Sequence, residues 1–451
     1  MDKTVCELFA GVGGFRCGLN HINSAKTNLN DEKWKTVWFN QWEPAEKTTQ
    51  YAHDCYVYHF GTLLDKEGND TTNYNIEDVD KSQIPDFNLL VGGFPCQDYS
   101  VASTLATSKG LNGKKGILWW SIREIIEKKK PPFVLLENVD RLLKSPAKQR
   151  GRDFGVILAC FRDEDYTVEW RVINAADYGY QQRRRRIFIF AYKNDTEYAA
   201  AVNVGNEENV INWICETGFF ATAFPVTRAD KQMVLSVELP QEVGEVSEKF
   251  KFEFGNAGVM KYGKVFTIKT EPLYTGRQIT LGDIIEHGKV DNKYFIPESR
   301  LYYDAPDIDH SDETHTRLSS EKRKTWQYIK GAKKMPRKAA NGHEYIYSEG
   351  AVPMIDAYDK PARTMLTSEG GFSRTTHIVK DRKSGKIRLL TAVETERIQG
   401  FPDDYTKTCL REGKEVEMPL NKRRFMMGNA LVVDLIKQME PVLSQILDKE
   451  L

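Results

Sequence analysis

The chain has 451 residues, 40% of them hydrophobic and 28% charged, which is an ordinary globular composition. This length predicts two or three domains, and no apolar run reaches the roughly 18 residues that a membrane span needs. Lys and Arg balance Asp and Glu at 64 each, so the net charge does not indicate a nucleic-acid partner, although a local basic surface would suffice for one.

The cysteine spacing argues against a zinc-binding protein, and the first residues argue against a secreted one. Seven cysteines are scattered along the chain, and no two have the CxxC spacing that is typical of zinc sites. The N-terminal residues lack the basic and apolar regions of a signal peptide. We therefore expect reduced thiols, no metal site and a cytoplasmic protein.

The first predicted strand, residues 4–8, is followed by a glycine-rich turn and the start of a helix. Gly11, Gly13 and Gly14 let the backbone turn sharply and approach a ligand closely. This pattern is shorter than the dinucleotide fingerprint, and alone it is only a weak indication of a nucleotide-like cofactor.

The second predicted strand, residues 35–39, ends in a polar and acidic stretch, Asn40-Gln41-Trp42-Glu43. Polar groups at this distance after a glycine turn suit the ribose hydroxyls and the adenine of an adenosyl cofactor. The alternative is an ordinary loop in which Trp42 belongs to the core.

A third apolar run, residues 89–93, ends at two glycines and is followed by Pro95 and Cys96. Such a run predicts a buried strand, and ligands of open α/β sheets bind at the carboxyl ends of the strands. Cys96 is therefore a candidate nucleophile, although most cysteines are buried structural residues. The polar, glycine-containing stretch 103–116 predicts a mobile loop that closes over the site.

The run 133–139 repeats this arrangement, because it also reads as a buried strand and carries Glu137 near its end. Two more strands are expected around 167–172 and 187–192, with an arginine cluster at 183–186 between them. The alternation of strands and helices predicts a mostly parallel sheet, with Cys96 and Glu137 at the same edge.

From about residue 195 the alternation is lost. The segment 322–338 holds eight basic residues interleaved with Trp326 and Tyr328, which favours either a solvated face or contact with nucleic acid. Apolar residues between 431 and 446 follow helical spacing. They predict a C-terminal helix that packs back on the distant sheet, because its apolar stripe needs a partner.

Six motifs, in this order, resemble those of the bacterial-type DNA (cytosine-5)-methyltransferases, over roughly residues 4–192 and 386–446. They are Phe9-Ala10-Gly11-Val12-Gly13-Gly14, Pro95-Cys96-Gln97, Glu137-Asn138-Val139, Gln182-Arg183-Arg184-Arg185-Arg186, Arg388-Leu389-Leu390-Thr391 with Arg397-Ile398-Gln399-Gly400-Phe401-Pro402, and Gly428-Asn429-Ala430.

The resemblance implies an α/β fold, the Rossmann-like doubly wound sheet of S-adenosylmethionine-dependent methyltransferases, with a second, smaller target-recognition domain. The implied division is a catalytic and cofactor-binding domain at 1–194, a target-recognition domain at 195–385 and a C-terminal segment, 386–451, that returns to the catalytic domain.

The implied activity is sequence-specific methylation of carbon 5 of a cytosine that is flipped out of the duplex. Carbon 5 is a poor nucleophile, and thiolate attack at carbon 6 makes it reactive. By resemblance Cys96 is that thiolate, and Glu137 contacts ring nitrogen 3 and the exocyclic amine. Arg184 and Arg186 match the pair that binds the base oxygen.

The implied cofactor is S-adenosylmethionine, with Asp78 as the acceptor for the adenine amine. The family usually has Glu where this chain has Gln41, so the ribose is expected at either Gln41 or Glu43. The full set of expected cofactor contacts is Phe9, Gly11, Val12, Gly14, Gln41, Trp42, Asp78, Pro95, Leu118 and Asn429.

The expected partner is double-stranded DNA, bound by a monomer that belongs or is related to a restriction-modification system, with a cognate endonuclease acting separately. Two alternatives are a tRNA cytosine-5 methyltransferase, which a recognition region of about 190 residues disfavours, and an inactive DNA-binding protein, which the four catalytic residues disfavour. The expected DNA contacts are Ser100, Ser103, Lys322, Arg323 and Lys324.

Overall fold

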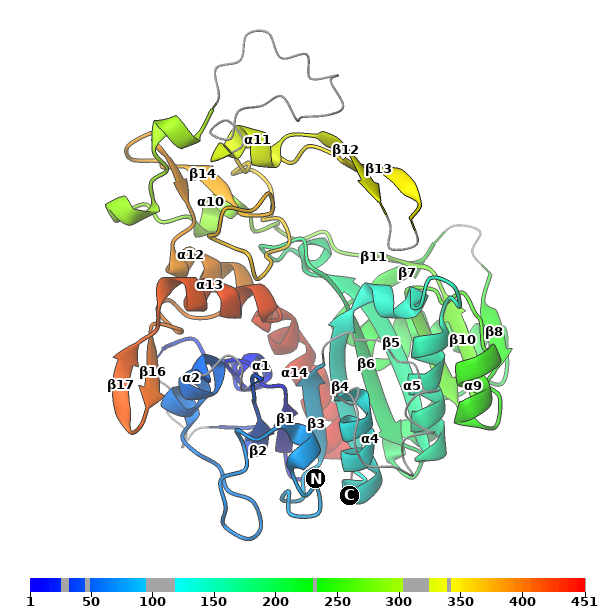
Figure 1. Ribbon diagram of the computed structural model, residues 1–451. Helices are drawn as coiled ribbons and strands as arrows, with labels where there is room; N and C mark the ends of the chain where they lie inside the picture. The colour runs from blue at the N-terminus through cyan, green and yellow to red at the C-terminus, as the bar shows by residue number, and fades with distance from the viewer. Residues whose placement is uncertain are drawn as a thin grey trace.

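A large mixed sheet forms the centre of the computed structural model, which describes residues 1–25, 32–44, 49–94, 118–229, 233–302, 324–338 and 342–450 (Figure 1). Within these residues the sheet has nine strands in the order β2-β1-β3-β4-β6-β5-β9-β10-β8. The bounds are β1 Thr4–Leu8, β2 Lys35–Asn40, β3 Leu89–Gly93, β4 Phe133–Val139, β5 Tyr166–Asn174, β6 Arg185–Lys193, β8 Leu235–Glu238, β9 Ala257–Lys261 and β10 Lys264–Ile268.

The strands β2, β1, β3 and β4 pair in parallel, and from β4 to β8 every pair in the sheet is antiparallel. The α/β fold class is confirmed, but the expectation of a mostly parallel sheet is wrong for the second half. Only residues 175–184 separate β5 from β6, and a parallel pair needs a crossover of about a dozen residues or more. The two strands therefore pair as antiparallel neighbours.

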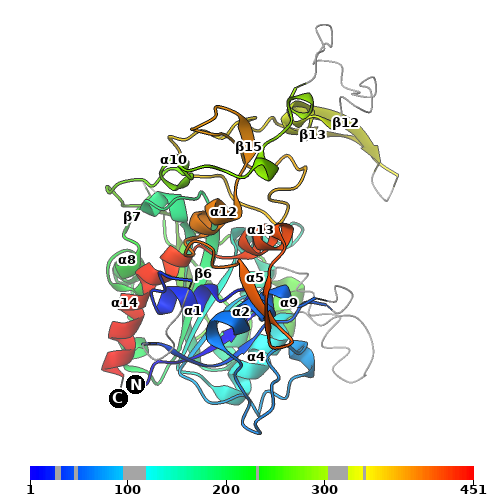
Figure 2. The ribbon, with the colours of Figure 1, turned by 90° about the vertical axis from the view of Figure 1, so that its left-hand side faces the viewer.

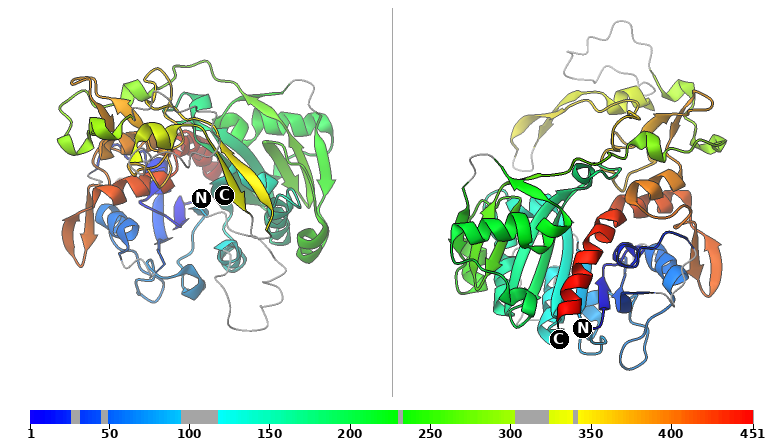
Figure 3. Two further views of the ribbon diagram at one scale, coloured as in Figure 1. Left: turned by 45° about the horizontal axis from the view of Figure 1, so that its top comes forward. Right: turned by 180° about the vertical axis from the view of Figure 1, so that it is seen from behind.

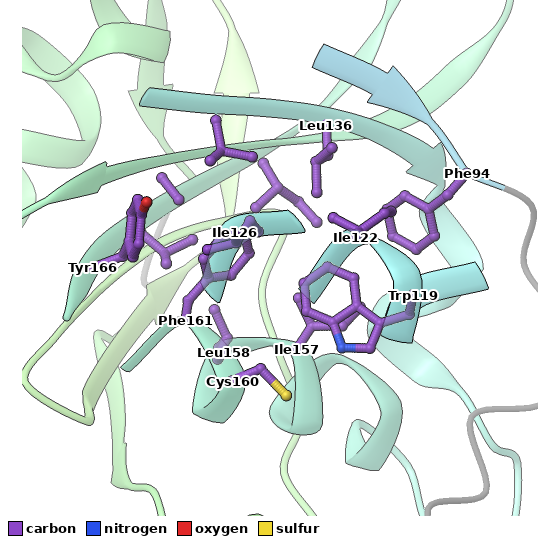
Figure 4. Close-up of a cluster of buried hydrophobic side chains, with 14 of the residues drawn as sticks. Phe94, Trp119, Ile122, Ile126, Leu136, Ile157, Leu158, Cys160, Phe161 and Tyr166 are labelled. Carbon is purple, nitrogen blue, oxygen red and sulfur yellow. The ribbon is translucent and has the colours of Figure 1, made fainter. Parts of the chain in front are cut away.

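Helices cover both faces of the sheet. On one face α4 (Leu118–Lys129) and α5 (Arg152–Asp163) bury a cluster that includes Trp119 and Phe161 against β4 and β5 (Figure 4). On the other face α1 (Gly14–Leu19), α8 (Phe219–Ala223) and α14 (Val433–Lys449) pack on the sheet. Both faces of the sheet are buried beneath helices, which explains why these strands are continuous apolar runs in the sequence.

The C-terminal helix α14 packs on the first strands, as the sequence predicts. Leu435, Met439 and Leu443 are fully buried with Val5 of β1 and Leu89 of β3. The chain ends lie side by side (Figures 1 and 3), and the Met1 amino group donates to the Leu447 carbonyl at 3.3 Å.

The described residues between β11 (Thr270–Pro272) and α12 (Ala392–Gln399) form the upper part of the molecule, above α12 and α13 (Leu420–Asn429) (Figure 1). The predicted boundary at 194/195 stays a prediction, but β8, β9 and β10, which follow it, extend the sheet. The remaining elements are α2 Tyr51–Phe60, α6 Glu197–Ala200, α7 Glu207–Asn212, α9 Val243–Lys249, α10 Leu281–Ile284, α11 Trp326–Lys330, β7 Val226–Arg228, β12 Lys333–Lys338, β13 Glu344–Glu349, β14 Ile378–Lys380, β15 Ile387–Leu389, β16 Thr408–Arg411 and β17 Lys414–Glu417.

The substitution Leu443→Ala should lower the free energy of unfolding by about 2–5 kcal/mol, because it leaves a cavity between α14 and the sheet. The exposed Gln445 lies on the same helix, so Gln445→Ala is the matched control and should change stability by less than about 0.5 kcal/mol. Urea unfolding followed by circular dichroism measures both. Equal effects of the two substitutions would show that α14 does not stabilise the sheet.

Candidate active site

A cavity of about 880 Å³ lies at the carboxyl ends of β1, β2, β3 and β4. The turns that follow β1 and β2 form one wall, and the ends of β3 and β4 form another. Residues 422–431, which include the end of α13, close the cavity from the C-terminal side. This is the edge at which the sequence places the ligand site, because parallel strands present their carboxyl ends together.

The glycine turn after β1 is required by both conformation and space. Gly11 and Gly13 have φ angles of +58° and +89°, which glycine adopts at little cost. A Cβ on Gly13 would lie 2.7 Å from the Phe60 ring, whereas one on Gly11 would meet nothing within 4 Å. The turn therefore packs tightly on α2 and leaves open space at Gly11.

Glu7 of β1 lies beneath this turn and is 1% exposed. Its carboxylate accepts hydrogen bonds from the Phe15 amide at 3.2 Å and from the Tyr56 hydroxyl at 3.0 Å. Burial raises the pKa of Glu7 to about 7, although both hydrogen bonds and Arg16 act in the opposite direction. The start of α1 is thus held by a carboxyl group with a strongly raised pKa.

The end of β2 holds two loops in place. The Gln41 side-chain oxygen accepts a hydrogen bond from the Gly11 backbone N–H at 2.7 Å. The Asn40 side-chain amide donates to the Tyr74 carbonyl at 2.9 Å. The second contact brings residues 75–77 to the cavity wall, while Asp78 is exposed and is not among the lining residues. Sequence reasoning missed Asn75 and Ile76, because their approach depends on contacts with a distant strand.

The ends of β3 and β4 lie side by side. Gly93 pairs in register with Glu137, and a Cβ on Gly93 would lie 3.3 Å from a Glu137 carboxylate oxygen. The buried Asn138 amide donates to the Phe94 carbonyl at 3.0 Å. These contacts fix the residue that follows β3, Phe94, next to the end of β4 that carries the Glu137 carboxylate. Pro95, Cys96, Ser100, Ser103 and the predicted loop 103–116 lie outside the described residues.

An arginine pair faces this carboxylate from the start of β6. Arg186 Nε is 2.8 Å from Glu137 Oε1, because β6 runs antiparallel to β4 and so begins where β4 ends. Arg184 is 2% exposed and donates to the Met365 carbonyl at 3.0 Å. Burial, together with the charge of Arg186, lowers the pKa of Arg184 to about 9, so its guanidinium stays protonated near neutral pH.

Most of the described sequence-predicted residues line this one cavity. They are Phe9, Gly11, Val12, Gly14, Gln41, Trp42, Leu118, Glu137, Arg184, Arg186 and Asn429. Leu366, Thr367, Lys422 and Phe425 also line it, and no local pattern in the sequence marks them. Lys324 is exposed and is not one of the lining residues, and Lys322 and Arg323 lie outside the described residues.

The described part of the chain lacks two features, a metal-ligand cluster and a membrane-spanning helix. In these residues no group of three or more His, Cys, Asp or Glu side chains is arranged to hold a metal ion. None of their helices combines the length and the apolar composition that would let it cross a membrane.

The cavity, its glycine turn and the Glu137–Arg186 pair define an α/β enzyme that binds a ligand at the carboxyl edge of its sheet. The sequence matches the family of C-5 cytosine-specific DNA methylases over residues 3–444. The chain belongs to this family and is a DNA (cytosine-5-)-methyltransferase, as its motifs predict.

The chain is similar in sequence to two type II methyltransferases and in fold to two solved structures. It is 42% identical over 433 residues to the type II methyltransferase M.Sau3AI of Staphylococcus aureus, covering 96% of this chain and 93% of that protein. It is 32% identical over 189 residues to the type II methyltransferase M.HhaI of Haemophilus parahaemolyticus, covering 42% and 49%. The S. pombe Dnmt2 methyltransferase aligns with a TM-score of 0.53 at 13% identity over 99% of this chain and 98% of that one. The Entamoeba histolytica methyltransferase EhMeth aligns with a TM-score of 0.52 at 14% identity over 99% of each chain. Both structures show the fold alone.

The substitution Glu7→Gln should flatten the pH dependence of stability. The carboxyl pKa is about 7 in the folded chain against an ordinary 4.5, so the folded state binds more protons in this window. The free energy of unfolding therefore falls as pH rises from 4.5 to 7. Removing Glu7 should remove up to about 3 kcal/mol of this fall.

Urea unfolding at several pH values between 4.5 and 8 measures the effect. The exposed Glu208, changed in the same way to Gln, is the control. The raised pKa would be contradicted if wild type and Glu7→Gln lost the same stability across the window.

Proposed function

We propose that this methyltransferase takes its methyl group from S-adenosylmethionine and transfers it to a flipped cytosine in a specific DNA sequence, through covalent addition of Cys96. The observation that carries the proposal is the Glu137–Arg186 pair, which faces the glycine turn across a single cavity. A carboxyl group held in place beside an adenosyl-type site can hydrogen-bond nitrogen 3 and the exocyclic amine of a cytosine as charge builds on the ring.

The donor groups of the cavity fit S-adenosylmethionine. Trp42, Ile76 and Leu118 offer apolar surface for an adenine ring, and the open space at Gly11 lets a ligand approach the backbone. The Gln41 oxygen already accepts from Gly11, so Glu43 is the better acceptor for the ribose hydroxyls. Asn75 and Ile76 are better placed than Asp78 to contact the adenine edge. When bound, S-adenosylmethionine supplies an electrophilic methyl group.

Each catalytic side chain has one task. The Cys96 thiolate forms a bond to carbon 6, and the electron pair of the 5,6 double bond then makes carbon 5 nucleophilic. Glu137 hydrogen-bonds nitrogen 3 and the exocyclic amine as charge builds on the ring, and Arg186 fixes the orientation of that carboxylate. After methyl transfer a base removes the carbon 5 proton, and the electrons of that bond expel Cys96 as thiolate.

The target-recognition function belongs to the upper part of the molecule. Within the predicted region 195–385, the segments that form β8, β9 and β10 belong to the central sheet, so we assign recognition to the part of this region that follows β11, residues 273–385. The relatives are named type II methyltransferases, which supports a place in a restriction-modification system. The protein would then act as a monomer on cytoplasmic DNA, with a separate cognate endonuclease.

A duplex with 5-fluorocytosine at the target should trap the wild-type protein covalently, because fluorine cannot leave carbon 5 as a proton does. Cys96→Ser should form no adduct, since a serine hydroxyl is essentially un-ionised near neutral pH and adds poorly to carbon 6. Bisulfite sequencing of DNA from expressing cells identifies the target. A denaturing gel with both proteins side by side then measures the adduct.

The matched control is Cys215→Ser, which removes a thiol from a segment that does not line the cavity and should still be trapped. Equal methylation by wild type and Cys96→Ser would remove Cys96 from the mechanism.

Replacing Lys322, Arg323 and Lys324 with alanine should weaken DNA binding and flatten its salt dependence. Each lost phosphate contact lowers the slope of log K against log salt by about 0.9. Fluorescence anisotropy at several salt concentrations measures this slope. Changing Lys249, Lys251 and Lys264 to alanine removes three exposed charges elsewhere and is the control. An unchanged slope in the Lys322/Arg323/Lys324 variant would show that these residues do not contact DNA phosphates and only face solvent.

A further inference from the structure

A two-stranded hairpin, β12–β13, stands away from the rest of the molecule (Figures 2 and 3). Its strands pair antiparallel from Lys333↔Glu349 to Lys338↔Glu344 and, among the described strands, form a sheet of their own. An isolated hairpin of this kind is only marginally stable in water. Its order therefore depends on the contacts that hold its base.

Glu349 connects the base of the hairpin to the upper part of the molecule. Its carboxylate accepts from the Tyr347 hydroxyl at 2.7 Å and pairs with Arg374 at 3.2 Å. The buried Lys330, at the end of α11, donates to the Thr376 carbonyl at 2.7 Å. The hairpin is thus a projecting arm with a fixed base.

Arg337 is exposed on β12 beyond this base. Its guanidinium carbon lies 3.7 Å from the centre of the Tyr347 ring, and Arg337 is directly opposite Tyr345 in the register. The three side chains therefore share one face of the hairpin. Among the described residues, no hydrogen bond satisfies the N–H groups of this guanidinium.

This stacking restricts the Arg337 side chain while it leaves the edge of the guanidinium accessible. A stacked guanidinium keeps its fork of N–H donors in one plane, so less conformational freedom is lost when it binds. β12 also carries the exposed Lys334, next to the base, and the exposed Lys338, at the outer end. Both face away from Arg337 because neighbouring residues of a strand alternate. The arm therefore offers one oriented donor pair on one face and two positive charges on the other.

We propose that the β12–β13 hairpin enters the major groove of the DNA substrate and that Arg337 reads a guanine there. The inference rests on the proposed function, because it needs duplex DNA as substrate. A major groove about 12 Å wide admits a two-stranded ribbon, whereas a minor groove of about 6 Å does not. A guanidinium fork matches guanine O6 and N7, and the flanking lysines match the phosphates.

The test compares the base preferences of three variants on a pool of duplexes with randomised positions around the cytosine, read by bisulfite sequencing. Arg337→Ala should keep methylation but lose the preference for one G·C pair, by roughly 5- to 150-fold. Arg337→Gln should shift the preference at that position toward A·T, because an amide pairs with adenine N6 and N7. Lys338→Ala, on the other face of the same strand, should leave every preference unchanged.

Each outcome decides one point. A uniform loss of methylation across all sequences in Arg337→Ala, or unchanged preferences in both Arg337 variants, would overturn the base-reading role. A changed preference in Lys338→Ala alone would assign the reading to the other face and overturn it as well. If the wild-type protein left the pool unmethylated, the proposed function would fail, and that failure is distinct from failure of the hairpin.

Discussion

The contact between α14 and the first strands is the constraint on which the rest of the structure depends. The strands β1, β3 and β4 carry buried apolar side chains on both faces, so a second layer must cover the face that α4 and α5 leave open. The last helix of the chain provides much of that layer. The chain must therefore return to its beginning, and this return carries Gly428 and Asn429 to the wall of the cavity.

Small residues on α1 permit this contact at short range. A Cβ on Gly18 would lie 2.4 Å from Ile436 Cβ, and one on Gly14 would meet Leu431 at 3.2 Å. The Trp34 indole donates to Glu440 of α14 at 2.8 Å. Burial raises the pKa of Glu440, but hydrogen bonds from Lys33, Ser444 and Trp34 outweigh it and lower this pKa to about 2. Packing and a buried polar contact thus fix the same helix, so the glycine turn and the C-terminal wall of the cavity are held together.

The sequence predicted the parts of the molecule that local patterns encode. The strand ends at Gly93 and Glu137 and the apolar stripe of α14 are visible in periodicity alone. The extension by β8, β9 and β10 was not predicted, because β8 is a mostly exposed strand of four residues with no clear alternation. Asn75 and Leu366 were missed because contacts with remote segments bring them to the cavity.

The four consecutive arginines at 183–186 are identical in sequence, but the backbone directs their side chains to two different sides. Along an extended chain alternate side chains face the same side, and here Arg184 and Arg186 turn inward while Arg183 and Arg185 are exposed. Gln182 continues the inward series, and its side-chain oxygen accepts from the Met365 amide at 3.2 Å.

The inward-facing residues therefore make two different contacts, one with a distant segment and one with Glu137. Gln182 and Arg184 hold the segment that returns from the upper part of the molecule at Met365, and Arg186 holds Glu137. Leu366 and Thr367, next to that anchored residue, line the cavity. A buried guanidinium that loses its partners is costly, so the contacts of Arg184 hold the upper part of the molecule in place against the sheet. The Glu137 carboxylate and the segment that descends from the upper part of the molecule are thereby both held by residues 182–186.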